Sequence, residues 1–351
     1  MTKRTAGFAP MEALLAAELP QGSGWQFEPK WDGFRCLARR DGDEVTLTSK
    51  SGKPLARYFP DVVDMLGKLT STRFLLDGEL IIPVGDALSF DALQLRLHPA
   101  ESRVRKLAKE SPAELMAFDL LELDGKSLAA LPLSERRECL ERFFATNTAP
   151  GLHLSPMTCD RDTAVLWLER SGGALDGVIA KRADQEYRSG ERAMIKVKQQ
   201  RTADCVVGGF RYAEKKKEVG SLLLGLYDAE GKLDHVGFTS AIPSAERPRL
   251  TEELEKLVQA PGFTGSAPGG PSRWNTQRSM AWQPLKPVLV VEVRYDQVTG
   301  RRFRHGTGFL RWRPDKDPRQ CTFEQLAPEL RPSELKELFG SGARLTCLPN
   351  R

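Results

Sequence analysis

The stretch from Glu28 to Arg35, E-P-K-W-D-G-F-R, crowds a lysine, two acids and an arginine into eight residues. We interpret Lys30 as a nucleophile, because a lysine amine attacks only when deprotonated, and neighbouring cations or partial desolvation favour that form. Arg35 would supply part of the cationic surrounding. Gly33 carries no Cβ and would let the backbone pass close to a bound ligand. These residues alone leave a second interpretation open, a strand preceded by a polar turn.

Length and composition predict a two-domain protein of ordinary core size. The chain has 351 residues, with 40% hydrophobic and 28% charged residues. Such a length exceeds the usual single domain. No apolar run approaches the roughly 20 residues that cross a bilayer, and the N-terminus lacks the apolar segment of a signal peptide. We therefore expect a cytoplasmic protein with no membrane partner.

The cysteines argue against a zinc site and against a disulfide framework. The chain has 6 cysteines and none forms a C-x-x-C pair. We expect most of them to be buried thiols. They are Cys36, Cys139, Cys159, Cys205, Cys321 and Cys347.

Positive charge is concentrated in the last part of the chain. Residues 1–200 carry 28 Lys and Arg against 29 Asp and Glu, whereas residues 201–351 carry 24 against 18. A polyanion would be held by the second part through counterion release. A weakly basic region is more often only a soluble surface, so charge alone does not decide for nucleic acid.

The first 200 residues alternate strand and helix patterns. Gly33–Arg40 and Glu44–Thr48 flank the turn Asp41-Gly42-Asp43, which predicts a hairpin. The polar loop Ser49–Lys53 follows it. The other expected strands are Phe74–Pro83, Leu115–Leu123, Ala174–Lys181 and Met194–Lys198. The expected helices are Met11–Leu19, Tyr58–Leu69, a pair within Phe90–Lys109, Leu133–Ala145 and Thr163–Ser171.

Charged residues inside these apolar strands are site candidates. Asp77 and Glu79 interrupt a compact apolar strand, and buried acids are costly unless paired or metal-bound. A turn in an edge strand is the alternative. Phe118 is available for base stacking, although a lone strand aromatic is usually core. Lys196 and Lys198 lie on one face of their strand, where they repel each other unless an anion lies between them.

After Gln200 the pattern changes to short β-strands. The expected strands are Ala203–Tyr212, Ser221–Asp228, Lys232–Thr239, Val288–Val298 and Phe303–Trp312, with one helix over Ser244–Val258. A connector rich in Pro, Gly and Ser, from Ala260 to Pro287, is expected to hold only short ordered pieces. Five short strands with one helix fit a small closed barrel such as an OB-fold, a common platform for nucleic acid.

Seven short motifs occur in a definite order. They are K-W-D-G-F-R, S-K-S-G, L-D-G-E, F-D-L-L, D-G-V-I-A-K, I-K-V-K and R-W-R-P-D-K. In this order they resemble motifs I, Ia, III, IIIa, IV, V and VI of the ATP-dependent DNA ligases. The resemblance runs from about residue 28 to residue 318 and is strongest to the compact bacterial repair ligases.

The resemblance implies an α+β fold with two domains. Residues 1–200 would form an adenylation (nucleotidyltransferase) domain, with ATP-grasp-like antiparallel sheets and helices, and residues 201–351 an OB-fold barrel. It also implies the chemistry of DNA ligase (ATP). Lys30 would attack the α-phosphate of ATP, the AMP would pass to the 5′-phosphate of a nick, and the 3′-hydroxyl would displace it. All three steps are in-line phosphoryl transfers that need positioning and neutralisation of phosphate charge.

The resemblance also assigns roles to individual residues. Glu28 would contact the adenine edge, Phe118 would stack on the base, and Glu79 would lie near the ribose and the metal. Asp32 would orient Arg35 or Lys30, with Asp77 in support. Mg²⁺ or Mn²⁺ would bind Glu79 and Asp176. The residues expected to neutralise phosphate are Arg35, Lys50, Lys181, Lys196 and Lys198.

The last motif, with Arg313, Asp315 and Lys316, would close over ATP in the first step. The barrel would therefore move about a hinge near residues 199–202.

Two positions depart from the family pattern. Lys50 stands where many relatives carry arginine, which keeps the charge but loses a planar fork for phosphate. Asp176 stands where glutamate is usual, so its carboxylate is one methylene shorter and its metal contact could run through water.

Two other readings of the sequence remain. An RNA ligase or a capping guanylyltransferase shares the lysine nucleophile and most motifs, although the E-P-K context and the R-x-D-K ending favour DNA ligase. A non-catalytic nucleic-acid-binding protein is the alternative of another class. For the ligase, the expected partners are nicked double-stranded DNA and repair proteins, and the chain is expected to be a monomer at the bacterial nucleoid.

Overall fold

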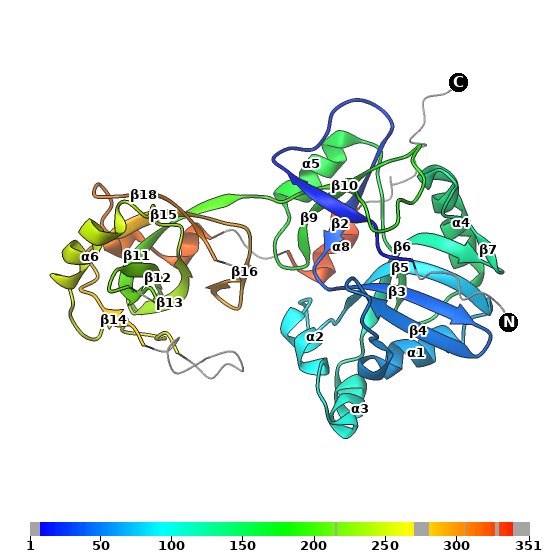
Figure 1. Cartoon of the computed structure of the whole chain (residues 1–351), viewed down its shortest axis with the longest axis horizontal. Helices are drawn as coiled ribbons and strands as arrows, with labels where there is room; N and C mark the ends of the chain where they lie inside the picture. Colours follow the sequence, from blue (N-terminus) through cyan, green and yellow to red (C-terminus); the bar gives the residue numbers. More distant parts are fainter. Residues whose placement is uncertain (1–7, 215, 270–280, 305, 327–329, 340–351) are drawn as a thin grey trace. The chain divides into compact units, whose positions relative to one another are not determined.

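The chain divides into two compact units (Figure 1). The computed structural model describes residues 8–214, 216–269, 281–304, 306–326 and 330–339. The first unit comprises residues 1–199 together with 330–351, and the second comprises residues 200–329. Within the described residues, no helix has the length and apolarity needed to span a membrane.

The first unit is built on two sheets. In the described part of the chain, one is four-stranded, with β1 (Glu12–Ala16), β10 (Arg192–Val197), β9 (Leu175–Arg182) and β2 (Trp25–Trp31) side by side in that order. The other runs in the order β4 (Glu44–Ser49), β3 (Phe34–Asp41), β5 (Arg73–Ile81), β6 (Glu114–Leu123) and β7 (Lys126–Ser127), with β8 (Leu152–Leu154) also beside β6. Pairing is antiparallel except between β1 and β10 and between β6 and β8.

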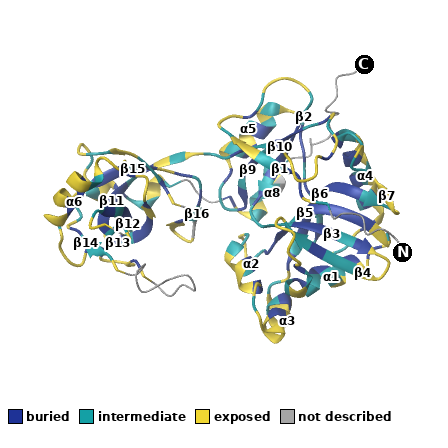
Figure 2. Ribbon diagram, in the orientation of Figure 1, coloured by how far each residue is buried: buried dark blue, intermediate teal, exposed yellow. Residues whose placement is uncertain are grey.

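Helices surround these sheets, and some pack on strands whereas others pack on neighbouring helices. They are α1 (Pro60–Gly67), α2 (Phe90–Arg96), α3 (Glu101–Glu110), α4 (Leu133–Thr146) and α5 (Arg161–Glu169). Trp167 of α5 is fully buried against Phe27 of β2 and Val178 of β9. Phe74 of β5 meets Phe143 of α4 edge to face, with ring centroids 5.1 Å apart. Each sheet therefore has its own apolar layer, and Figure 2 shows β5 and β6 of the larger sheet mostly buried.

The chain crosses from one sheet to the other at Asp32 and Gly33. β2 ends at Trp31 in the four-stranded sheet and β3 begins at Phe34 in the other. The register of β2 against β9 is broken by a bulge between Pro29 and Trp31, at Lys30. Bulges of this kind re-aim a side chain. The crossing places Lys30 at the boundary between the two sheets.

In the described residues, the second unit is a barrel of antiparallel strands that one parallel bridge closes. In the described residues its sheet runs in the order β13 (Leu233–Thr239), β12 (Val219–Tyr227), β11 (Arg201–Tyr212), β15 (Val290–Tyr295) and β18 (Gly308–Trp312), and β14 (Gln283–Pro284) also pairs with β11. A bridge between Thr239 and Thr307 joins the end of β13 to the residue before β18. That bridge closes the sheet, because β13 and β18 are its two edges.

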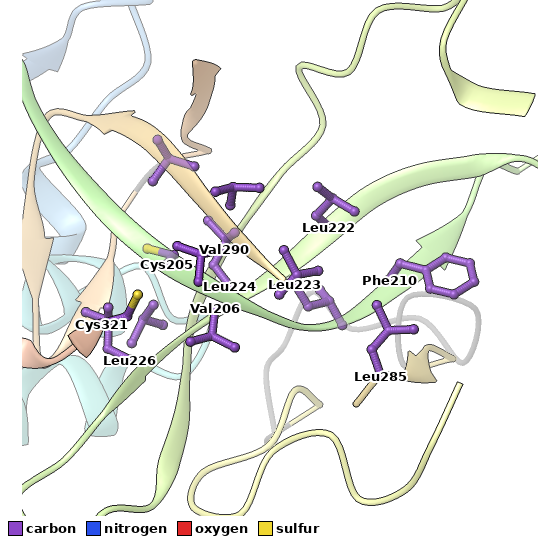
Figure 3. Packing of buried hydrophobic residues seen from close by; sticks show 14 of the residues in the cluster. Cys205, Val206, Phe210, Leu222, Leu223, Leu224, Leu226, Leu285, Val290 and Cys321 are labelled. Atoms are coloured by element: carbon purple, nitrogen blue, oxygen red, sulfur yellow. The ribbon is translucent and has the colours of Figure 1, made fainter. Parts of the chain in front are cut away.

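The barrel is filled by apolar side chains and is completed by smaller elements. Figure 3 shows part of its core, in which Cys205, Phe210 and Leu224 are wholly buried. The remaining elements are α6 (Arg247–Glu255), the short pair β16 (Val298–Thr299) and β17 (Arg302–Phe303), and 3₁₀ turns at Pro318–Gln320 and Phe323–Gln325. The α+β class and the five-stranded barrel are confirmed. The part of the expected connector at residues 270–280 lies outside the described residues.

One predicted helix is wrong. Met11–Leu19 was expected to be helical, but β1 (Glu12–Ala16) runs parallel to β10, with Leu14 opposite Ile195. The sequence E-A-L-L-A favours helix by intrinsic propensity. That preference is worth only about 0–0.7 kcal/mol per residue, and hydrogen bonding to the sheet edge outweighs it. The predicted hairpin and the helix pair within Phe90–Lys109 are confirmed.

The cysteines follow the expectation in part. Cys36, Cys205 and Cys321 are buried free thiols, and Cys139 is a free thiol that is half-buried. Cys159 differs, because it is disulfide-bonded.

The end of the chain returns to the first unit, whereas residues 201–351 were expected to form the barrel. Leu330 accepts a hydrogen bond from the amide of Ala174 and donates one to the carbonyl of Gly172, at 3.0 and 3.1 Å. The helix α8 (Leu335–Phe339) follows a 3₁₀ turn at Pro332–Glu334. The ring of Phe339 lies edge to face against Trp31 and Trp167, with centroids 5.9 and 5.2 Å away. These contacts pack Phe339 against two tryptophans of the first unit.

Replacing Phe339 by alanine is expected to destabilise the first unit by about 1–3 kcal/mol, less than for a fully buried phenylalanine because Phe339 is only half-buried. Denaturant unfolding followed by tryptophan fluorescence measures this loss, since both ring partners are tryptophans. The exposed Glu337→Ala serves as the matched control in the same helix. An unchanged unfolding midpoint for Phe339→Ala would contradict the packing role.

Candidate active site

A cavity of about 260 Å³ lies between the two sheets of the first unit. The four-stranded sheet contributes residues of β1, β2, β9 and β10, and the other sheet contributes residues of β3, β5 and β6. Most of the residues proposed from the sequence line it. These are Glu28, Lys30, Arg35, Lys50, Glu79, Phe118, Lys181 and Lys196.

Asp176 is held between two lysines at one end of this site. The Lys30 Nζ donates to Asp176 Oδ2 at 2.5 Å, and the Lys198 Nζ lies 2.9 Å from Asp176 Oδ1. The Asp176 side chain is 8% exposed and that of Lys30 is 25% exposed. Both carboxylate oxygens are therefore engaged by ammonium groups, so that Asp176 brings Lys30 of motif I close to Lys198 of motif V.

The two glycines of these motifs are required by neighbouring backbone. Gly177 has φ +123°, and a Cβ there would overlap the carbonyl oxygen of Val197, the residue before Lys198. A Cβ at Gly33 would overlap the carbonyl oxygen of Leu80 in β5. The expectation that Gly33 makes room for a ligand is thus corrected, because the close approach is to a strand.

Three further ammonium groups, those of Lys50, Lys196 and Lys198, gather near Lys30. Burial and repulsion from Lys30, Lys50 and Lys198 lower the pKa of Lys196. Lys50 pairs with Glu12 of β1 at 3.1 Å, and this contact lowers the pKa of the Glu12 carboxyl. Like charges so close together are costly without an anion. The arrangement is suited to bind a group with several negative charges.

The other end of the cavity is built around Phe118. Glu28 Oε2 and Lys181 Nζ form a buried pair at 2.6 Å, with both side chains at most 4% exposed. The Lys181 Nζ lies 4.7 Å from the centroid of the Phe118 ring, close enough for a cation–π contact. Lys181 was expected to neutralise phosphate and Glu28 to contact adenine. The structure pairs these two side chains with each other, at the aromatic end.

Arg35 is held by Asp77. The Nε and Nη2 atoms of Arg35 donate to the two oxygens of Asp77, both at 2.6 Å. Burial opposes the charge of Arg35, but attraction to Asp77 outweighs it and raises the pKa of Arg35. Asp32 was expected to orient Arg35 or Lys30. In the structure Asp77 holds Arg35 and Asp176 binds Lys30, so Asp77 lies in an interior strand as an ion-pair partner rather than at an edge turn.

Glu79 is the acid whose proton affinity is most altered in the cavity. Burial raises its pKa to about 7, although Lys30 and Arg35 act in the opposite direction. No group of three or more His, Cys, Asp or Glu side chains within the described ranges is placed to hold a metal ion. A metal at Glu79 would therefore need oxygens from a bound substrate, and Asp176 already carries two ammonium partners.

The residues of the last motif lie in the second unit. Arg313 Nη1 donates to both oxygens of Asp204, at 2.9 and 3.1 Å, and Lys316 lies 3.5 Å from the same carboxylate. Arg313 also donates to Asp315 and lowers the pKa of Asp315 to about 2. These cations are paired within the barrel and are not part of the cavity in the first unit.

Three residues with clear roles in this geometry were missed from the sequence. They are Glu12, which pairs with Lys50, Asp204, which holds Arg313, and Tyr187, which binds Asp77. None lies in a motif. Their partners are 38, 109 and 110 residues away, so no local pattern indicates these contacts.

Comparisons with known proteins show which family the chain resembles. Residues 10–198 match a family model described as "ATP dependent DNA ligase domain", and residues 215–316 match "ATP dependent DNA ligase C terminal region". The chain is 47% identical over 334 residues to "DNA ligase C2" of Mycolicibacterium smegmatis, covering 91% of this chain and 94% of the relative. It is 44% identical over 335 residues to "DNA ligase C" of Mycobacterium tuberculosis, covering 91% and 93%.

Among solved structures, one of Lig E DNA ligases aligns with a TM-score of 0.52 at 17% identity, covering 87% of this chain and all of that chain. At that identity the likeness concerns the fold alone.

Replacing Gly177 by alanine is expected to cost about 3 kcal/mol or more, through unfavourable φ and overlap with Val197. Thermal and denaturant unfolding would measure the loss. Gly67→Ala is the matched control, because its Cβ would meet nothing within 4 Å and its helical position favours alanine by about 0.5–1 kcal/mol. Equal stability of the two variants would refute the close approach of β9 to the end of β10.

Proposed function

The chain belongs to the ATP-dependent DNA ligase family, and from that premise we propose that it seals nicks in double-stranded DNA during repair, carrying AMP on Lys30. One observation carries the proposal. The ammonium groups of Lys30, Lys50, Lys196 and Lys198 converge beside a cavity whose other end is aromatic. A triphosphate with a planar base has the matching charge and shape.

The contacts of Lys30 support its role as nucleophile. The Nζ of Lys30 donates a hydrogen bond to Asp176 Oδ2, so this carboxylate is placed to accept a proton as the amine attacks. The new P–N bond forms while the bond from the α-phosphorus to pyrophosphate breaks. Lys196 and Lys198 are placed to stabilise the charge on the phosphate oxygens in that step.

The later steps reuse the same residues. The 5′-phosphate oxygen of the nick attacks the α-phosphorus of the lysyl adenylate, and the amine of Lys30 leaves with a proton. The 3′-hydroxyl then attacks the 5′-phosphorus and AMP departs. Each transfer places a phosphate among the lysines that face Asp176, so one set of cations serves all three.

A divalent cation, Mg²⁺ or Mn²⁺, would neutralise phosphate charge during these transfers. Glu79 fits as one carboxylate ligand, because its half-buried side chain lines the cavity near Lys30. Asp176 fits less well while both of its oxygens bind ammonium groups. We assign to Arg313 and Lys316 the binding of the departing pyrophosphate, which requires them to leave Asp204.

Replacing Lys30 by alanine is expected to abolish covalent labelling of the protein by ATP that carries radioactive phosphorus at the α-position. The wild-type chain should retain the label after denaturing electrophoresis, should retain none with labelled GTP, and should seal a nicked duplex. Lys53→Ala, an exposed lysine outside the cavity, is the control and should label normally. Labelling of the Lys30 variant would show that another residue carries AMP. Labelling of the wild-type chain by GTP would favour a capping enzyme.

The pKa of Glu79 predicts a pH-dependent requirement for metal. Below pH 7 Glu79 is mostly protonated, and a metal ion must displace that proton in order to bind. The Mg²⁺ concentration that gives half-maximal labelling should therefore fall by up to about tenfold per pH unit as the pH rises towards 7, and then level off.

Measuring the half-maximal Mg²⁺ concentration, rather than the rate, separates Glu79 from the titration of the nucleophile. Glu79→Gln has no titrating carboxyl, so its half-maximal Mg²⁺ concentration should be high and should not change with pH. A requirement in the wild-type chain that is equal at pH 6 and pH 8 would rule out Glu79 as the metal ligand.

A further inference from the structure

Tyr187 lies behind the cavity and not in it. It follows β9 in the first unit, is 6% exposed, and is absent from the residues that line the cavity. Its hydroxyl donates to Asp77 Oδ2 at 2.7 Å and accepts a hydrogen bond from the backbone amide of Met11 at 2.8 Å. One hydroxyl group thus joins two segments that are 66 residues apart in the chain.

Both of these segments lead to the cavity. Asp77 binds Arg35 through two hydrogen bonds, and the Arg35 guanidinium lies 4.5 Å from the centroid of the Phe118 ring. Met11 lines the cavity, and its carbonyl oxygen accepts from Arg35 Nη2 at 3.4 Å. The hydroxyl of Tyr187 therefore reaches Arg35 by two routes, through a carboxylate and through a backbone carbonyl.

Tyr187 is itself firmly held. The guanidinium of Arg136 lies 5.7 Å from the centroid of the Tyr187 ring. Arg136 is fully buried and donates two hydrogen bonds to the carboxylate of Asp119. The backbone amide of Tyr187 donates to the carbonyl of Ala129 at 2.8 Å. The ring is thus fixed from the side of α4, and the hydroxyl is fixed with it.

We propose that Tyr187 is a positioning residue for the ATP pocket: its hydroxyl locks Asp77 and Met11, and so sets the place of Arg35 against Phe118. The inference rests on the proposed function, because it assigns the aromatic end of the cavity to the nucleotide. Tyr187 does not line the cavity that would hold the nucleotide and Lys30, so its loss is expected to alter the binding of ATP rather than the transfer of AMP.

Tyr187→Phe tests this by removing one oxygen atom. Without it, the amide of Met11 and one oxygen of Asp77 each lose a buried partner, and the two segments are free to shift. The ATP concentration for half-maximal self-labelling should rise about five- to thirtyfold, while the labelling rate at saturating ATP stays within about twofold of wild type. Tyr227→Phe is the control, since Tyr227 is equally buried but lies in the second unit.

A double-mutant cycle with Asp77→Asn distinguishes positioning from general destabilisation. If Tyr187 acts through Asp77, the double variant should need little more ATP than Asp77→Asn alone, so the two effects are far from multiplicative. Multiplicative effects, or losses that follow the folded fraction in melting curves, would overturn the proposal. So would an unchanged ATP requirement in Tyr187→Phe. A wild-type chain that ATP does not label would instead refute the proposed function.

Discussion

The site depends on one buried carboxylate between two ammonium groups. Asp176 binds Lys30 through one oxygen and Lys198 through the other. The three residues come from β2, from β9 and from the end of β10, so the ion pairs also fix the edge of the four-stranded sheet. A buried carboxylate without partners would be strongly destabilising. Folding of the sheet and assembly of the proposed catalytic lysines are consequently the same event.

In the cavity, the strongly buried charges are paired with protein groups of opposite charge, whereas the less buried lysines repel one another. Arg35 has Asp77 and Lys181 has Glu28, and these pairs form the aromatic end. Burial, together with repulsion from the neighbouring lysines, lowers the pKa of Lys196. A bound triphosphate would relieve that repulsion, so the cost of gathering the lysines is met during folding and recovered when the substrate binds.

Much of the fold could be predicted from the sequence because its signals are local. The turn Asp41-Gly42-Asp43 and the alternation around Lys196 each depend on a few neighbouring residues. Most of the proposed site residues could be named from the motifs because these resemble a known family. The helix predicted at Met11–Leu19 failed because a sheet edge decided its conformation. The pairing of Arg35 with Asp77 was equally out of reach, since 42 residues separate the two and no local pattern links them.

The return of the chain at Leu330 changes how movement of the second unit has to be understood. The chain leaves the first unit at Gln199 and is anchored there again at Leu330, through two backbone hydrogen bonds to Gly172 and Ala174. A body joined at one point can swing in any direction, whereas a body joined at two points turns freely only about the line between them. The expected hinge near residues 199–202 would therefore be only one of the two connections that limit the movement of the second unit. Gly172 and Ala174 shortly precede Asp176, so the second attachment of the chain lies close in sequence to the carboxylate that binds Lys30.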